Sequence, residues 1–227
     1  KPSFFCLEPH PYFSLGAPYG DSLGPWWLRK GVKNRLLLAQ NYLQLESTSF
    51  CLAIFDALRP IPVQEFMIDH TINKLCSFRG FKRDDESKEF ELKEVIAEVG
   101  CFWAIPSLDP NMPPPHSTGG AVDLTLADKH GTPLDMGGEI DDIGLVSYPN
   151  HYLEAAKNDP VSNLYHERRT ILSKVMTMAG FIQHPKEWWH FSYGDQMWAW
   201  KTNSEKAFYG RWFTSESNAM TASSPKF

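Results

Sequence analysis

The sequence predicts an α+β fold in which helices pack on one side of a largely antiparallel central sheet. Helical and strand-like patterns are mixed along the chain and do not alternate as they do in a parallel βαβ protein. The 227 residues, of which 42% are hydrophobic and 14% aromatic, suit one large core better than two small ones. We therefore predict a single domain over residues 1–213 and a small, polar, disordered tail over residues 214–227.

The first part of the chain combines an irregular arm with a helix and a strand. Residues 1–31 are rich in proline, glycine and aromatic side chains, which predicts an ordered arm that packs by its rings. Residues 33–46 repeat leucine and alanine at helical spacing among good helix formers. An apolar run over residues 50–55 has the length of a buried strand, and Asp56 ends it.

The second quarter predicts further helices and then a loop. Pro62 stands where a helix would begin, and residues 68–78 repeat apolar side chains at helical spacing. Residues 82–98 are highly charged, which predicts an exposed helix or loop. Residues 107–115 are rich in proline and predict an irregular segment.

The remaining elements complete the sheet and its cover. Residues 121–126 are strand-like, and residues 128–131 form the turn that ends the strand. Residues 134–150 predict a long surface loop of the kind that is often functional. A helix is predicted over residues 163–179, and residues 188–193 form an aromatic, strand-like run.

Charge and hydropathy limit the classes of partner. The formal net charge is −5, whereas phosphate binding usually needs a basic face, so we expect no nucleic-acid partner. No apolar run approaches the roughly 18 residues that span a bilayer, so we expect no membrane insertion. No signal-peptide pattern is present, which favours the cytoplasm, with the periplasm as the alternative if a leader was removed before Lys1.

Four cysteines occur without any C-x-x-C pair: Cys6, Cys51, Cys76 and Cys101. Their spacing argues against a thiolate zinc site. We expect buried free thiols, with a disulfide as the alternative in an exported protein.

His116 and Asp123 form the first candidate for a metal site. A loop with two glycines delivers the histidine, and a strand carries the aspartate inward. A neutral imidazole nitrogen and a carboxylate oxygen are suitable zinc ligands. The pair alone has little specificity, because such spacings occur by chance.

Glu187 and His190 form the second candidate, in the run Glu-Trp-Trp-His. His190 would be a third ligand, and three protein ligands with an open position are typical of catalytic zinc. Glu187 would then take a proton from the metal's water. In a regular strand the two side chains point to opposite faces, so a bend before His190 is required. The alternative is an aromatic core strand with an exposed glutamate.

Arg59 follows the strand that ends at Asp56, in the run Asp-Ala-Leu-Arg-Pro. It would point into a cleft and stabilise a developing oxyanion. The alternative is an ordinary ion pair between Arg59 and Asp56.

Together these segments resemble the D-alanyl-D-alanine dipeptidases of the vancomycin-resistance type, which belong to the zinc DD-peptidases. Residues 116–126 read HSTGGAVDLTL, similar to the family's H-S-x-G-x-A-[IV]-D-L-T-L, and residues 187–190 read EWWH, as the family does. Residues 54–60 read IFDALRP, similar to a family strand that ends in D-x-[YL]-R-P. The order and approximate separations agree, and the resemblance covers about residues 33–195.

The resemblance implies a DD-peptidase or hedgehog-like fold, one Zn²⁺ per chain and hydrolysis of free D-Ala-D-Ala. It also implies roles for individual residues. Zinc would be bound by His116, Asp123 and His190, with Glu187 as general base and acid. Arg59 would bind substrate and stabilise the tetrahedral intermediate. Residues 136–141 read MGGEID, similar to the family's M-G-x-x-[FI]-D, so Asp141 would receive the ammonium of the dipeptide.

Two departures from the family pattern concern substrate preference. Residues 113–115 are three prolines where the family often has serines. The N-terminal arm has no clear match to the family's tyrosine-containing segment, and Tyr12 and Tyr19 are the two candidates to substitute for it. We interpret His151 and His184 as surface or loop histidines.

Two other functions remain open. A D,D- or L,D-carboxypeptidase that acts on peptidoglycan stems is one, and a catalytically inactive zinc-binding module of the same fold is the other. Asp141 argues against the first, and the presence of Glu187 argues against the second.

Overall fold

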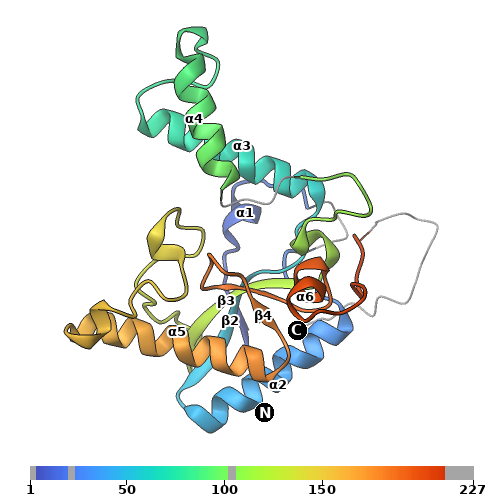
Figure 1. Ribbon diagram of the computed structural model, residues 1–227, viewed down its shortest axis with the longest axis vertical. Coiled ribbons are helices and arrows are strands. Elements are labelled where there is room, and N and C mark those ends of the chain that lie inside the picture. Colours follow the sequence, from blue (N-terminus) through green and yellow to red (C-terminus); the bar gives the residue numbers. More distant parts are fainter. Residues whose placement is uncertain (1–3, 20–23, 102–105, 213–227) are drawn as a thin grey trace.

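Figure 1 shows the computed structural model of the chain, which describes residues 4–19, 24–101 and 106–212. A mixed five-stranded sheet, ordered β1-β2-β3-β5-β4, lies at the centre. Only the β1–β2 pair is parallel among the described strands, and the other pairs are antiparallel. The strands are β1 (Phe5–Cys6), β2 (Phe50–Asp56), β3 (Ala121–Asp128), β4 (Ile182–Gln183) and β5 (His190–Ser192). The predicted α+β class with a largely antiparallel sheet is confirmed.

The helices fall into two groups around the sheet. In Figure 1, α2 and α5 lie alongside each other across the sheet, whereas α3 and α4 form a pair that projects from the opposite end. The α-helices are α1 (Pro11–Ser14), α2 (Lys30–Glu46), α3 (Ile61–Phe78), α4 (Glu89–Gly100), α5 (Pro160–Met178) and α6 (Gln196–Lys201). The 3₁₀ turns are η1 (Glu86–Lys88), η2 (Pro115–Thr118), η3 (Leu145–Ser147) and η4 (Ala155–Lys157).

Each group of helices has its own apolar cluster. The larger cluster packs α2 and α5 against the sheet through fully buried side chains, among them Leu36, Leu43, Leu124, Leu126, Leu172 and Val175. The smaller cluster joins α3 and α4 to the N-terminal arm, and it includes Tyr12, Tyr19, Val63, Met67, Val95 and Val99. The arm is therefore tied to the end of the molecule from which α3 and α4 project.

Most predicted elements are present, with shifted ends. The helix expected at 163–179 begins earlier, because Pro160 occupies its first turn and the Asp159 carboxylate accepts a hydrogen bond from the Ser162 backbone N–H. The charged segment after Lys82 contains η1 and the exposed helix α4. Within the described residues of 134–150, η3 is the only regular element, so the predicted loop is confirmed.

Two predictions need correction. The strand expected at 188–193 is only β5, because residues 184–189 form a bend before it. Among the cysteines, which are all free, only Cys76 is buried; Cys6 and Cys51 are half-buried, and Cys101, at the C-terminal end of α4, is exposed.

Three further predictions concern the N-terminal arm, membrane insertion and the C-terminal tail. The N-terminal arm does pack by its rings, although β1 and α1 make it less irregular than expected. None of the helices in the described part of the chain combines the length and apolar character that a membrane crossing needs. The tail over 214–227 lies outside the described residues, and the single-domain boundary at 213 stays a prediction.

Candidate active site

A cavity of about 290 Å³ lies where the ends of β3 and β5 meet the loops above them. Segments that lie far apart in the sequence line it, from Arg59 to Met197. The polar and charged side chains that line it are Arg59, Gln64, His116, Asp123, Asp141, Asp142, His184, Lys186, Glu187 and His190. All six residues that the sequence singled out for chemistry therefore face one cavity.

Strand pairing brings two of these side chains, Asp123 and His190, into one row with Asp56. Asp123 on β3 pairs with His190 on β5, and on its other side it pairs with Asp56 on β2. A β-bulge between Ile54 and Asp56 makes this second pairing possible, because regular alternation would place Phe55 opposite Asp123. The bulge therefore turns a carboxylate, and not a phenyl ring, toward the row.

His116 reaches the same place from η2, just before β3 begins. Gly119 follows η2 in the left-handed region, with φ of 69°, where a side chain would be strained. At Gly120, a Cβ atom would lie 2.9 Å from the carbonyl oxygen of Tyr193. The two glycines thus allow the chain to turn from His116 straight into β3 and against β5.

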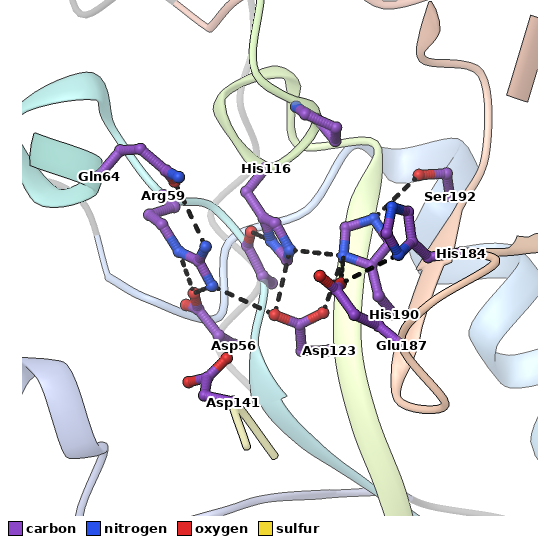
Figure 2. A network of polar contacts seen from close by, with 12 residues as sticks. Asp56, Arg59, Gln64, His116, Asp123, Asp141, His184, Glu187, His190 and Ser192 are labelled. Carbon is purple, nitrogen blue, oxygen red and sulfur yellow. Dashed lines mark hydrogen bonds and ion pairs between the residues drawn. The ribbon is translucent and has the colours of Figure 1, made fainter. Parts of the chain in front are cut away.

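The three predicted zinc ligands converge in Figure 2. Nε2 of His116 lies 3.1 Å from Oδ2 of Asp123 and 3.1 Å from Nδ1 of His190. Nδ1 of His190 lies 3.0 Å from Oδ1 of Asp123. All three side chains are buried, with relative exposures of 4%, 2% and 6%.

Neighbouring groups set the tautomers of both histidines. Nδ1 of His116 donates to the carbonyl oxygen of Ala57 at 2.7 Å, so Nε2 of a neutral ring carries a lone pair. Nε2 of His190 lies 3.3 Å from the Ser192 hydroxyl, which leaves Nδ1 facing the centre. Such partners behind a metal-binding histidine fix its orientation.

This arrangement fits a zinc ion. The lone pairs of two imidazoles and one carboxylate converge, which is unfavourable unless a cation lies between them. In a tetrahedron with zinc bonds of about 2.0–2.1 Å, ligand atoms lie about 3.3 Å apart. The observed separations of 3.0–3.1 Å are close to that edge. Oδ1 of Asp123 is also buried without a hydrogen-bond partner in the described residues.

Glu187 lies beside these three residues, in the bend that precedes β5. Its Oε2 atom is 3.6 Å from Nδ1 of His190. The bend removes the strand alternation that would have turned Glu187 away from His190. Burial first, and then the charges of Asp123 and Asp141, raise the pKa of Glu187 well above its usual value.

His184 lies in a loop, as interpreted, but it faces the cavity. It is half-buried, lines the cavity, and places Nδ1 3.6 Å from Oε2 of Glu187. The reason is that its backbone N–H donates to the carbonyl oxygen of His190, which holds it against β5. Burial lowers the pKa of His184 to about 3. His151, by contrast, is exposed in a loop as expected.

Arg59 combines the two interpretations that the sequence left open. Nε donates to Oδ2 of Asp56 at 2.8 Å, and Nη2 donates to Oδ2 of Asp123 at 3.2 Å. Burial alone would lower the pKa of Arg59, but Asp56 and Asp123 raise it above its ordinary value. Arg59 is therefore a charged, 4% exposed side chain that both holds an ion pair and faces the cavity.

Asp141 lies in the long loop, with its backbone in the left-handed region at φ of 69°. Burial first, and then Asp142, raise the pKa of Asp141 to about 7. The hydroxyl of Tyr12 donates to Oδ2 of Asp141, so the N-terminal arm reaches the site. Tyr19 donates instead to Asp56, at 3.3 Å.

The sequence left one contributor to the site undecided and missed another. Tyr12 and Tyr19 were both candidates, because no local pattern predicts the contact of Tyr12 with a residue 129 positions away. Arg169 on α5 donates to the carbonyl oxygens of Met136, Val146 and Tyr148, and it thereby holds the loop that carries Asp141. The only sequence signal for the role of Arg169 is an arginine within the predicted helix 163–179.

Comparisons with known proteins agree with the resemblance. The D-ala-D-ala dipeptidase model of the peptidase M15 family matches residues 12–208. The chain is 42% identical over 215 residues to a D-alanyl-D-alanine dipeptidase of Synechocystis sp., an alignment that covers 90% of this chain and 86% of that protein. It is 40% identical over 76 residues to a D-alanyl-D-alanine dipeptidase of Escherichia coli (strain K12), covering 34% and 36% of the two chains.

Proposed function

This chain belongs to the D-Ala-D-Ala dipeptidase family, and from that membership we propose that it is a zinc enzyme that hydrolyses free D-Ala-D-Ala to two D-alanines. The family makes it a peptidase whose substrate is a small dipeptide. One observation supports the finer proposal above all others. Three buried lone pairs converge next to a carboxylate, Glu187, in a cavity of about 290 Å³.

One zinc ion per chain would be held by Nε2 of His116, a carboxylate oxygen of Asp123 and Nδ1 of His190. When bound, zinc supplies Lewis-acid chemistry, since it lowers the pKa of a water and polarises a carbonyl. Arg59 and Ala57 orient two of the ligands through the hydrogen bonds described above.

Glu187 is proposed to move the proton. It takes a proton from the attacking water as the C–O bond forms, and it returns that proton to the amine nitrogen as the C–N bond breaks. The raised pKa of Glu187 supports this role, because a group that stabilises its protonated form can hold the proton between the two steps.

Arg59 is proposed to balance the negative charge that develops on the carbonyl oxygen. Its guanidinium is buried and positioned before the reaction begins, so it stabilises charge without reorganisation. Its contact with Asp123 couples this role to the metal site.

Asp141 is proposed to bind the free ammonium of the dipeptide. The Tyr12 hydroxyl holds the carboxylate, and an ammonium beside it would lower the raised pKa by restoring a charge partner. A carboxylate at this end limits the substrate to one residue before the cleaved bond.

Turnover of three substrates tests this proposal: D-Ala-D-Ala, its N-acetyl derivative and a longer stem peptide. We expect efficient cleavage of the free dipeptide alone, and loss of activity with a chelator that zinc restores. Preference for the longer peptide would indicate a carboxypeptidase. Zinc binding without cleavage of any of the three would indicate an inactive zinc-binding module.

A further inference from the structure

A free dipeptide carries a charge at each end, so its C-terminal carboxylate also needs a partner. Two residues that line the cavity are permanently cationic, Arg59 and Lys186. Arg59 is buried and already paired with Asp56 and Asp123. Lys186 is exposed, and no ion pair within the described part of the chain includes it.

Lys186 also has a suitable place in the chain. It directly precedes Glu187, in the bend between β4 and β5, so its position relative to the reacting bond is set by the same short segment. Pro185 before it is exposed and restricts the backbone of this segment. Lys186 lines the cavity together with His184, which lies next to Glu187 and His190.

The cavity is lined by groups of opposite charge, Asp141 and Lys186. In the view of Figure 2, Glu187 lies between Asp141 on one side and His184 on the other. Asp141 and Lys186 line the same cavity as Glu187, the proposed proton-transfer group. Two residues of extended chain span about 7 Å, with the peptide bond at the middle. A zwitterionic dipeptide therefore matches a cavity that is lined by an anion, by Glu187 and by a cation.

We propose that Lys186 binds the C-terminal carboxylate of the dipeptide and is a specificity-determining residue. This inference rests on the proposed function, and it adds a partner for the C-terminal end of the dipeptide. Asp141 and Lys186 then select together for a substrate with both termini free and only one residue on each side of the bond. A peptide extended at its C-terminus loses the contact with Lys186, because its carboxylate lies beyond the ammonium of that side chain.

The expected size of the effect follows from exposure. An ion pair in contact with solvent is much weaker than a buried one, so removal of the Lys186 charge changes KM by about 3- to 10-fold and leaves kcat nearly unchanged. The charged head lies on a flexible stem, so Lys186→Arg retains most of the effect, and Lys186→Glu increases KM more than Lys186→Met does.

The test compares D-Ala-D-Ala with D-Ala-D-Ala amide, which has the same cleaved bond and a neutral C-terminus. We expect Lys186→Met to raise KM for the free acid and to leave KM for the amide unchanged. Lys201→Met is the matched control, since Lys201 is exposed and its charge also reaches His184, but it does not line this cavity. It should leave the preference for the acid intact.

Calorimetry with D-Ala-D-Ala on Glu187→Gln protein, with and without Lys186→Met, measures binding separately from turnover. A loss of affinity of about 3- to 10-fold is expected. Equal effects of Lys186→Met on acid and amide, or no effect on either, would overturn the role of Lys186 while wild-type turnover still supports the dipeptidase. A protein that neither cleaves nor binds D-Ala-D-Ala refutes the proposed function and, with it, this inference.

Discussion

The proposed metal site and the proposed substrate-binding groups come from differently built regions of the molecule. The metal site depends on neighbouring strands, where Asp123 pairs directly with His190 and both side chains are nearly inaccessible. The groups for the two ends of the dipeptide come from connecting segments. Asp141 lies in a loop with a left-handed backbone, and Lys186 lies in an exposed bend.

This difference separates chemistry from selectivity. Backbone pairing places two of the three proposed metal ligands, Asp123 and His190, within the sheet, so a substitution there should abolish the reaction. The loop groups are proposed to hold only the charged ends of the substrate, so substitutions there should change which substrate is preferred. The Asp141 loop has its own supports: Arg169 fixes it to α5, and Tyr12 fixes it to the N-terminal arm.

The most severe loss is expected from the metal ligands. His116→Ala and His190→Ala each remove one of three converging donors, so zinc content should fall from about one ion per chain to near zero and turnover with it. Metal analysis of the purified proteins measures this, with the exposed His151→Ala as the matched control. Normal zinc in both ligand variants would exclude the assigned site.

Glu187→Gln should separate metal binding from catalysis. The amide keeps the shape of the side chain but accepts no proton, so kcat is expected to fall by about 10²–10⁴-fold while zinc is retained. Parallel measurements of kcat and zinc content test this. A variant with full zinc and near-normal kcat would show that another group transfers the proton.

Arg59→Ala should lower kcat by about 10²–10³-fold, more than it raises KM. Because Arg59 also contacts Asp123, zinc content must be measured with the kinetics. Arg59→Lys should restore activity only in part, since an ammonium cannot bridge Asp56 and Asp123 with a planar fork. If only KM changes, Arg59 binds the substrate carboxylate and does not stabilise the oxyanion.

The sheet region was predictable from sequence because its signals are local. The apolar runs that form β2 and β3 have strand length, and His116 and Asp123 flank two glycines that explain the tight turn between them. Glu187 was harder to place, because strand alternation puts it opposite to His190. In the structure, β5 begins at His190. The sequence itself showed no bend before His190; the bend was inferred only because Glu187 and His190 could not otherwise face the same site.

The substrate-binding region depends on contacts that no local pattern encodes. Tyr12 contacts Asp141 because the N-terminal arm folds back to the site, and His184 is half-buried because its backbone pairs with β5. Without these tertiary contacts, a histidine in a polar segment is most simply interpreted as exposed. The bulge that turns Asp56 toward Asp123 was equally hidden, since it shifts the register by one residue.

The Asp141 contact should be visible as a preference for a free N-terminus. Acetylation removes the ammonium and leaves a desolvated carboxylate unpaired, so N-acetyl-D-Ala-D-Ala should have a kcat/KM at least about 10²-fold lower than the free dipeptide. Asp141→Asn should narrow this gap by weakening the free dipeptide more than the blocked one. Equal kcat/KM on both substrates for the wild-type protein would instead favour the carboxypeptidase.

The smallest effect concerns pH and depends on the pKa of Asp141, which burial raises to about 7. Protonation below that pH neutralises the carboxylate, so it no longer attracts the ammonium, whose own pKa is about 8. The ratio of kcat/KM for the free dipeptide to that for the N-acetyl derivative should therefore fall about 5- to 10-fold between about pH 7.5 and 6. Titration of Glu187 affects both substrates and therefore cancels in the ratio. In Asp141→Asn, the ratio of the two kcat/KM values should be nearly independent of pH over this range. A wild-type ratio that stays constant would show that Asp141 does not bind the ammonium.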